Sequence, residues 1–134
     1  MSNPAKKLFI DGFVGKSAER EVFLAFASSK TLSSLSFAEV LDEESGQGYQ
    51  RRFAPQHSLD FRRYIQRPNS STIPLTFNLR PVTDETWRLV RLKKGYARLE
   101  IRGNAPKILS QVDCQHRLGH LGDLEVPLPF MSFI

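Results

Sequence analysis

The sequence has almost no cysteine and no long hydrophobic run, and each scarcity excludes a class of protein. The single cysteine, Cys114, excludes an internal disulfide and a zinc site built from cysteines alone. No stretch approaches the roughly 18 consecutive apolar residues of a membrane-spanning helix, and the first residues lack the apolar region of a signal peptide. We therefore expect a reduced, cytoplasmic protein that does not act in a membrane.

Phenylalanine and arginine are the residues that stand out. Ten phenylalanines are spread over 134 residues, which favours a packed core in one domain, residues 1–134. The formal net charge of +5 favours polyanionic partners, because lysines and arginines near phosphates release counterions. Five arginines fall within seventeen residues: Arg51, Arg52, Arg62, Arg63 and Arg67. The pattern leaves open whether they form a solvated helix face or contact phosphates along DNA.

Hydrophobic periodicity predicts an α+β fold, a mixed sheet with short helices. Strands are expected at 20–27, 72–79, 86–92, 96–102, 107–112 and 126–134, a turn or short helix at 28–35, and a helix at 58–66. Gly12 and Gly15 are interpreted as turns, and S-F-A-E at 36–39 resembles the capping box of a helical turn. The chain ends on F-M-S-F-I without a polar tail, so we expect it to be part of a longer protein.

The segment 112–118, V-D-C-Q-H-R-L, has the pattern of an anion-binding turn between a strand and a helix. Asp113 stands where it can cap the helix, and the exposed amides of a helix N-terminus attract anions. Gln115 begins the helix, while His116 adds a titratable donor and Arg117 a guanidinium suited to bidentate contacts. The alternative is that Asp113 only caps and that His116 and Arg117 are ordinary polar surface residues. The residues alone leave both interpretations open.

The same segment resembles the D-G-Q-H-R signature of the DGQHR-domain family, which includes the DndB-like proteins associated with DNA phosphorothioation. G-F-V-G at 12–15, Q-R-R at 50–52, the helix at 61–65 and the strand at 72–79 resemble the N-terminal half of that family in the same order. The resemblance implies a ParB/sulfiredoxin-like fold, in which a strand-to-helix turn binds a nucleoside triphosphate or DNA phosphate. The residues matched by position are Asp113, Gln115, His116, Arg117, Gln50, Arg51 and Arg52.

Cys114 departs from that signature, which has glycine at this position. A thiol at a helix N-terminus beside histidine and arginine would have a lowered pKa and could act as a nucleophile. In the sulfiredoxin-like turn, however, the cysteine directly precedes the His-Arg pair, whereas Gln115 intervenes here. We favour a small residue that fills a glycine position. If the backbone there needs a positive φ, cysteine is strained by about 1 kcal/mol or more.

Metal binding is the weaker interpretation of the remaining polar residues. Asp113, His116 and His120 form a D-x-x-H-x-x-x-H run that one helix face could present to a metal, but cap and surface roles are favoured. His57 has no partner at metal-ligand spacing, so no metal site is predicted. Trp87 and Tyr96 are interpreted as core or hairpin residues rather than as platforms for stacking bases.

The sequence therefore supports two functional hypotheses. The first is a regulatory module that binds DNA or nucleotide phosphate within a DNA-modification system of the phosphorothioation type, or a defence system. The second is an enzyme, a nucleotide triphosphatase or a nuclease-like protein, that uses the same turn. Its cofactor would be a nucleoside triphosphate with Mg²⁺, and Asp113 is the single carboxylate within the motif. A third outcome is a degenerate fragment without activity.

Overall fold

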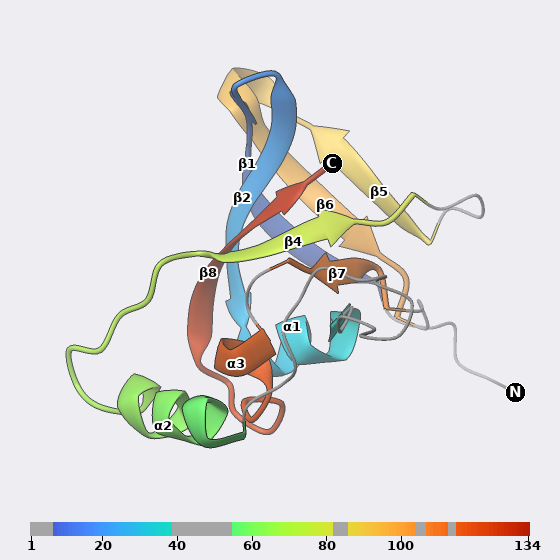
Figure 1. Ribbon diagram of the computed structural model, residues 1–134. Helices are drawn as coiled ribbons and strands as arrows, with labels where there is room; N and C mark the ends of the chain where they lie inside the picture. The colour runs from blue at the N-terminus through green and yellow to red at the C-terminus, as the bar shows by residue number, and fades with distance from the viewer. Residues whose placement is uncertain (1–6, 39–54, 82–85, 104–106, 113–114) are drawn as a thin grey trace, which may run out of the picture.

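The structure is a computed structural model that describes residues 7–38, 55–81, 86–103, 107–112 and 115–134 (Figure 1). It contains one eight-stranded mixed sheet in the order β3-β7-β4-β8-β2-β1-β6-β5. The short helices gather at one end of the sheet (Figure 1). The strands are β1 (Leu8–Ser17), β2 (Arg20–Ser28), β3 (Ser36–Ala38), β4 (Leu75–Leu79), β5 (Trp87–Arg91), β6 (Tyr96–Ile101), β7 (Leu109–Gln111) and β8 (Pro127–Phe133). The helices are α1 (Ser29–Leu35), α2 (Pro55–Ile65), α3 (Gln115–Leu118) and a 3₁₀ turn (Lys93–Gly95).

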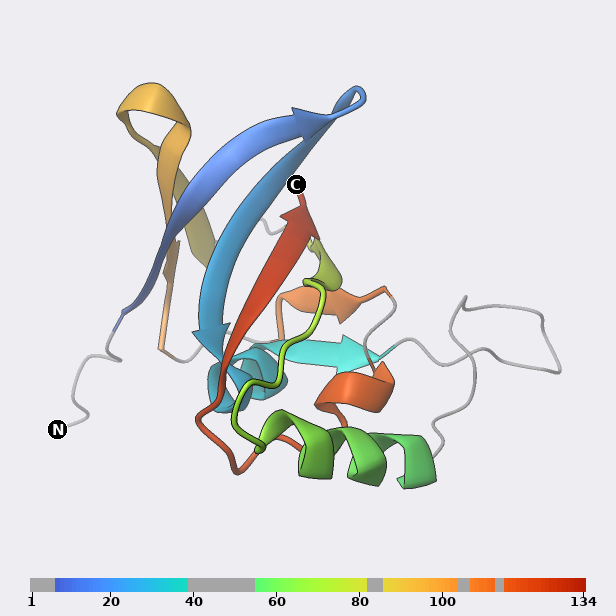
Figure 2. The same ribbon diagram turned by 90° about the vertical axis from the view of Figure 1, so that its left-hand side faces the viewer.

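The sheet combines antiparallel and parallel pairs, so the expected mixed sheet with short helices is confirmed. β5, β6, β1, β2 and β8 pair antiparallel in sequence across the sheet. β4 then joins β8 in parallel, β7 is antiparallel to β4, and β3 is parallel to β7. The long strands β1 and β2 bend along their length, so the sheet curves around its core (Figure 2).

Alternation along the strands places one face of the sheet in the core. On β6, Ala97, Leu99 and Ile101 are buried, and Leu99 lies opposite Ile10 of β1. The rings of Phe23 and Phe77 pack edge-on against that of Phe130, with centroids 6.1 and 5.9 Å away. Leu32 and Leu35 of α1, Ile65 of α2 and Leu118 of α3 close the core at the helix end of the sheet.

Gly12 and Gly15 do not mark turns as the sequence suggested, because both lie within β1. Gly12 is buried opposite Ala25 of β2. A Cβ at this position would collide with the carbonyl oxygen of Leu24 and approach the Cβ of Ala25 to 2.8 Å. Glycine is required here by the close approach of two strands rather than by a turn. The chain reverses at residues 18 and 19 instead, where Ala18 has a φ of 57°.

Ser36 begins a strand, so the expected capping box of a helical turn is wrong. β3 pairs in parallel with β7, and the Ser36 hydroxyl accepts a hydrogen bond from Gln111 Nε2 at 3.0 Å. Lys107 Nζ donates to the Ser36 carbonyl at 3.2 Å. The Ser36 hydroxyl and carbonyl are thus engaged by other segments of the chain. Pairing of β3 with β7 overrides the local preference of serine for a helix cap. Glu39, the last residue of the supposed box, lies outside the described residues.

The other expected elements are present with shifted bounds. The helix expected at 58–66 is α2, and the alternating strand expected at 72–79 is β4, which begins only after Pro74. Ser28 caps α1, because its hydroxyl accepts a hydrogen bond from the Thr31 amide at 3.1 Å. Trp87 packs against the core and its Nε1 donates to the Arg80 carbonyl, as a hairpin residue would. Tyr96 is half exposed and begins β6 directly after the β5–β6 turn, so it is a hairpin residue.

Candidate functional site

The predicted phosphate turn lies where β7 leads into α3. The strand and the short helix on either side of it are both present, as the sequence predicted. Asp113 and Cys114 themselves lie outside the described residues, and Gln115 and His116 are described only as the backbone of α3. Gln50, Arg51 and Arg52 also lie outside the described residues. The phosphate-binding roles of these residues therefore stay predictions, and Arg117 is the one predicted side chain that the structure describes.

Arg117 holds α3 against the chain that leads into β4. Its Nη1 donates to the Ile73 carbonyl at 2.7 Å and to the Thr72 hydroxyl at 3.1 Å. The side chain is half buried. The guanidinium therefore has a structural task that the motif did not indicate, and any phosphate contact must be made by the same group.

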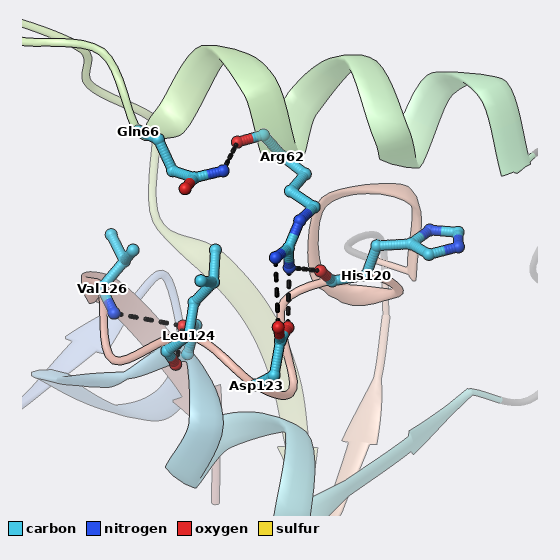
Figure 3. A network of polar contacts seen from close by, with 7 residues as sticks. Arg62, Gln66, His120, Asp123, Leu124 and Val126 are labelled. Atoms are coloured by element: carbon cyan, nitrogen blue, oxygen red, sulfur yellow. Dashed lines mark hydrogen bonds and ion pairs between the residues drawn. The ribbon is translucent and has the colours of Figure 1, made fainter.

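Arg62 connects α2 to the loop that follows α3 (Figure 3). Its Nη1 donates to the His120 carbonyl at 2.6 Å and to Asp123 Oδ1 at 2.7 Å, while Nη2 donates to Asp123 Oδ2 at 3.1 Å. This bidentate geometry is the strongest form of an arginine–carboxylate pair. The hydrogen bond from Arg62 holds the pKa of the Asp123 carboxyl below its usual range. Arg62 therefore serves the fold, whereas the sequence left open only a solvated helix face or contact with DNA phosphates.

Ser29 fixes the other end of that loop through Leu124 and Val126. Its fully buried hydroxyl donates to the Leu124 carbonyl at 2.5 Å and accepts from the Val126 amide at 3.2 Å. The backbone of Ser29 also donates to the Val126 carbonyl at 2.8 Å. Loop 119–126 is thus bound to α2 on one side and to α1 on the other, which fixes the position of the end of α3.

Two arginines of α2 and its end remain at the surface. The side chain of Arg63 is 72% exposed, and its Nη1 lies 3.7 Å from Asp60. Arg67 follows the helix and is exposed. Since α2 packs against α3, both arginines belong to the same end of the molecule as Arg117.

Neither hollow resolved on the hairpin side of the sheet includes a predicted site residue. One, of about 230 Å³, is lined by β5 and β6 together with Lys7, Thr86 and Arg102. The other, of about 300 Å³, lies between the ends of β1 and β2 and the β5–β6 turn. Among the described residues, no group of three His, Cys, Asp or Glu side chains is placed to hold a metal ion. No described helix is long and apolar enough to cross a membrane.

Comparisons of the chain with protein-family models, with characterised proteins and with solved structures find no match. The likeness to the DGQHR-domain family therefore stays a prediction that rests on the residues quoted for it.

Sequence reasoning missed the contacts of Arg62 and Ser29 that hold this region in place. Arg62 and Asp123 are 61 residues apart, and Ser29 is 95 residues from Leu124. No local spacing connects partners so distant in the chain. A weak signal existed for Ser29, because a serine pair at the start of a short helix is typical of a capping position, but only its neighbour Ser28 is the cap.

Proposed function

We propose that this chain is a regulatory module that binds DNA or nucleotide phosphate through the turn between β7 and α3. In this proposal it adopts a ParB/sulfiredoxin-like fold and acts in a DNA-modification system of the phosphorothioation type, or in a defence system. The observation that carries the proposal is the placement of α3 beside the arginine-bearing helix α2. Arg62 is paired with Asp123, and Arg63, Arg67 and Arg117 are further arginines at this end.

Phosphate contacts of this kind predict a strong dependence on salt. Each phosphate that a cation neutralises releases counterions, so the logarithm of the association constant should fall linearly with the logarithm of the salt concentration. The slope counts the contacts and changes by about one unit for each contact removed.

The test is duplex DNA binding across a salt series, followed by fluorescence anisotropy. Arg67→Gln should weaken binding and reduce the magnitude of the slope by about one. Lys93→Gln removes the same charge from the β5–β6 turn, at the far end of the sheet, and should leave the slope unchanged. The salt slope of Arg117→Gln is interpreted only together with the melting temperature of that variant, because Arg117 also holds α3. Equal slopes for wild type, Arg67→Gln and a folded Arg117→Gln protein would remove this turn from the proposal.

The enzymatic alternative differs from the regulatory module because an enzyme would hydrolyse its bound substrate. Phosphodiester or triphosphate cleavage needs a metal and a carboxylate, and Asp113 is the carboxylate within the motif. Incubation with labelled ATP and CTP in the presence of Mg²⁺ distinguishes the two hypotheses. Binding without hydrolysis supports the regulatory module, whereas hydrolysis that is lost in His116→Ala supports the enzyme.

A further inference from the structure

The outer face of β1, β2 and β6, opposite the core, exposes large apolar side chains. Their exposed fractions are 52% for Phe9, 49% for Phe13, 47% for Leu24, 70% for Phe26 and 51% for Tyr96. We call these five residues the aromatic face. Each alternates along its strand with residues that face the core, so the exposure follows from the strand period rather than from fraying.

The centre of the aromatic face crosses all three strands. Phe13 of β1 lies directly between Leu24 of β2 and Tyr96 of β6, and the rings of Phe13 and Tyr96 are 4.6 Å apart. At about 200 Å² for a whole aromatic side chain, the exposed fractions amount to roughly 500 Å² of apolar surface. A patch of this size is as large as the largest found on typical monomers, where such patches are often functional. The described helices lie at the end of the sheet rather than over this face (Figures 1 and 2).

Arginines lie among the rings of this surface. The Arg98 guanidinium lies 5.7 Å from the centre of the Phe9 ring, and its Nε donates to Asp11 at 2.7 Å. Arg20 lies 4.1 Å over the ring of Phe133 on the neighbouring strand β8. Arg88 pairs with Glu100 at 2.8 Å. The Arg98–Asp11 pair is exposed on both sides, so opening it to another anion costs little. In the other pair Arg88 is exposed, whereas Glu100 is only 15% exposed.

The strands that carry the aromatic face are strongly basic as a unit. Residues 7–28 and 86–103, which we call the hairpin half, contain nine Lys and Arg against four Asp and Glu, a net charge of +5. A second copy of the chain would bring the same net positive charge of its hairpin half close to this one, which disfavours self-association. A polyanion is attracted instead, and its association is speeded by this field.

Exposed rings beside arginines distinguish between forms of nucleic acid. A duplex keeps its bases stacked inside and offers aromatic side chains no free base. Unpaired bases stack on aromatic rings while their phosphates contact neighbouring cations, which is how sheet surfaces bind single strands. We propose that the aromatic face binds single-stranded nucleic acid, with unpaired bases stacked on its four rings and phosphates near Arg20, Arg88 and Arg98.

This binding surface goes beyond the proposed phosphate turn, because it uses other residues, another face of the molecule and another form of nucleic acid. The two proposals can therefore fail separately. Loss of duplex binding in Arg67→Gln tests the turn, and single-strand binding in variants of the aromatic face tests the present inference.

The experiment measures anisotropy of a labelled oligothymidylate of about 15 nucleotides, which is the site size of a small single-strand binder. Phe26→Ala and Phe13→Ala should each raise the dissociation constant by about tenfold, because each removes one stacked base. Ile73→Ala is the matched control, since Ile73 is 75% exposed but lies before β4 at the helix end. It should leave the dissociation constant unchanged.

Further measurements identify what binds to the aromatic face. Oligouridylate in place of oligothymidylate tells RNA from DNA, and Phe26→Trp should bind as wild type with its new fluorescence quenched by the stacked base. The inference is overturned if wild type does not bind single strands, if a duplex of the same sequence binds equally well, or if Phe26→Ala binds unchanged. It is also overturned if sedimentation shows a dimer that Phe26→Ala dissociates, because a second copy then covers the face.

Discussion

The helix end of the molecule, formed by α1, α2, α3 and loop 119–126, binds Arg62 and Arg117 into the structure, whereas the hairpin half leaves the large apolar side chains of the aromatic face at the surface. Arg62 and Arg117 each hold one segment against another through carbonyl and carboxylate oxygens. Phe26 and Phe9, in contrast, are exposed and do not belong to the buried core. An arginine at the helix end can thus stabilise the fold, and any ligand contact must be made by a guanidinium that already has protein partners.

This difference affects how binding variants are interpreted. Substitution of Arg117 changes both a proposed phosphate contact and the attachment of α3, so its effect on binding has two causes. Substitution of Phe26 changes a side chain that the core does not need. The aromatic face is therefore the surface on which binding and stability can be separated most cleanly.

The largest expected effect contrasts two phenylalanines on opposite faces of the sheet. Phe130→Ala opens a cavity between Phe23 and Phe77 and should lower the free energy of unfolding by about 3–5 kcal/mol. Phe26→Ala removes an exposed ring and should change it by less than about 0.5 kcal/mol. Urea denaturation measures both. A loss of similar size in the two variants would mean that the outer face is covered in solution.

A smaller effect is expected from the two glycines of β1. Gly12→Ala forces a Cβ against the backbone of β2, which should cost about 1–3 kcal/mol of unfolding free energy. Gly15→Ala meets nothing within 4 Å and should change it by less than about 0.5 kcal/mol. Thermal denaturation of the pair checks whether the close approach of β1 and β2 is required. Equal melting temperatures would contradict the role assigned to Gly12.

The smallest effect is a pH dependence at the helix end. Because Arg62 lowers the pKa of Asp123 from its ordinary value of 3.8, the stability that this carboxylate contributes is present above that pH. It is lost as the pH falls through the lower pKa of the folded state. Unfolding free energies of wild type and Asp123→Asn should differ at neutral pH and converge as the pH falls below 3.8.

The control for this prediction is Arg62→Ala. Without its partner, Asp123 loses the largest cause of its lowered pKa, so Asp123→Asn in that background should make a much smaller difference than in the wild type. A difference that persists undiminished would assign the pH dependence to another group.

The sequence predicted much of the fold because most of its elements have a local cause. Alternation identified β4, β6 and β8, and the apolar spacing of Phe61, Tyr64 and Ile65 identified α2. The capping box predicted at Ser36 was wrong, because the preference of serine for a cap was weaker than strand pairing with β7. The turn predicted at Gly12 was wrong, because a glycine that is required by contact with another strand cannot be told from a turn glycine in the sequence.

The candidate site was predicted in its local part only. The strand and helix around the turn are present, while the phosphate-binding roles of Asp113, Gln115, His116, Gln50, Arg51 and Arg52 stay predictions. The structural partners of Arg117 and Arg62 could not be predicted, because they come from segments 44 to 61 residues away.

The sequence by itself determined where most strands and helices form, β1 and β3 excepted, as well as the basic charge and the short motif before α3, because periodicity, charge and spacing are local properties of a chain. Only the tertiary structure decided which arginines are held by carbonyl and carboxylate groups and which rings lie side by side on an exposed face. Both depend on strand order and on contacts between segments far apart in the chain. Those contacts make Arg62 a structural residue and leave Phe26 at the surface.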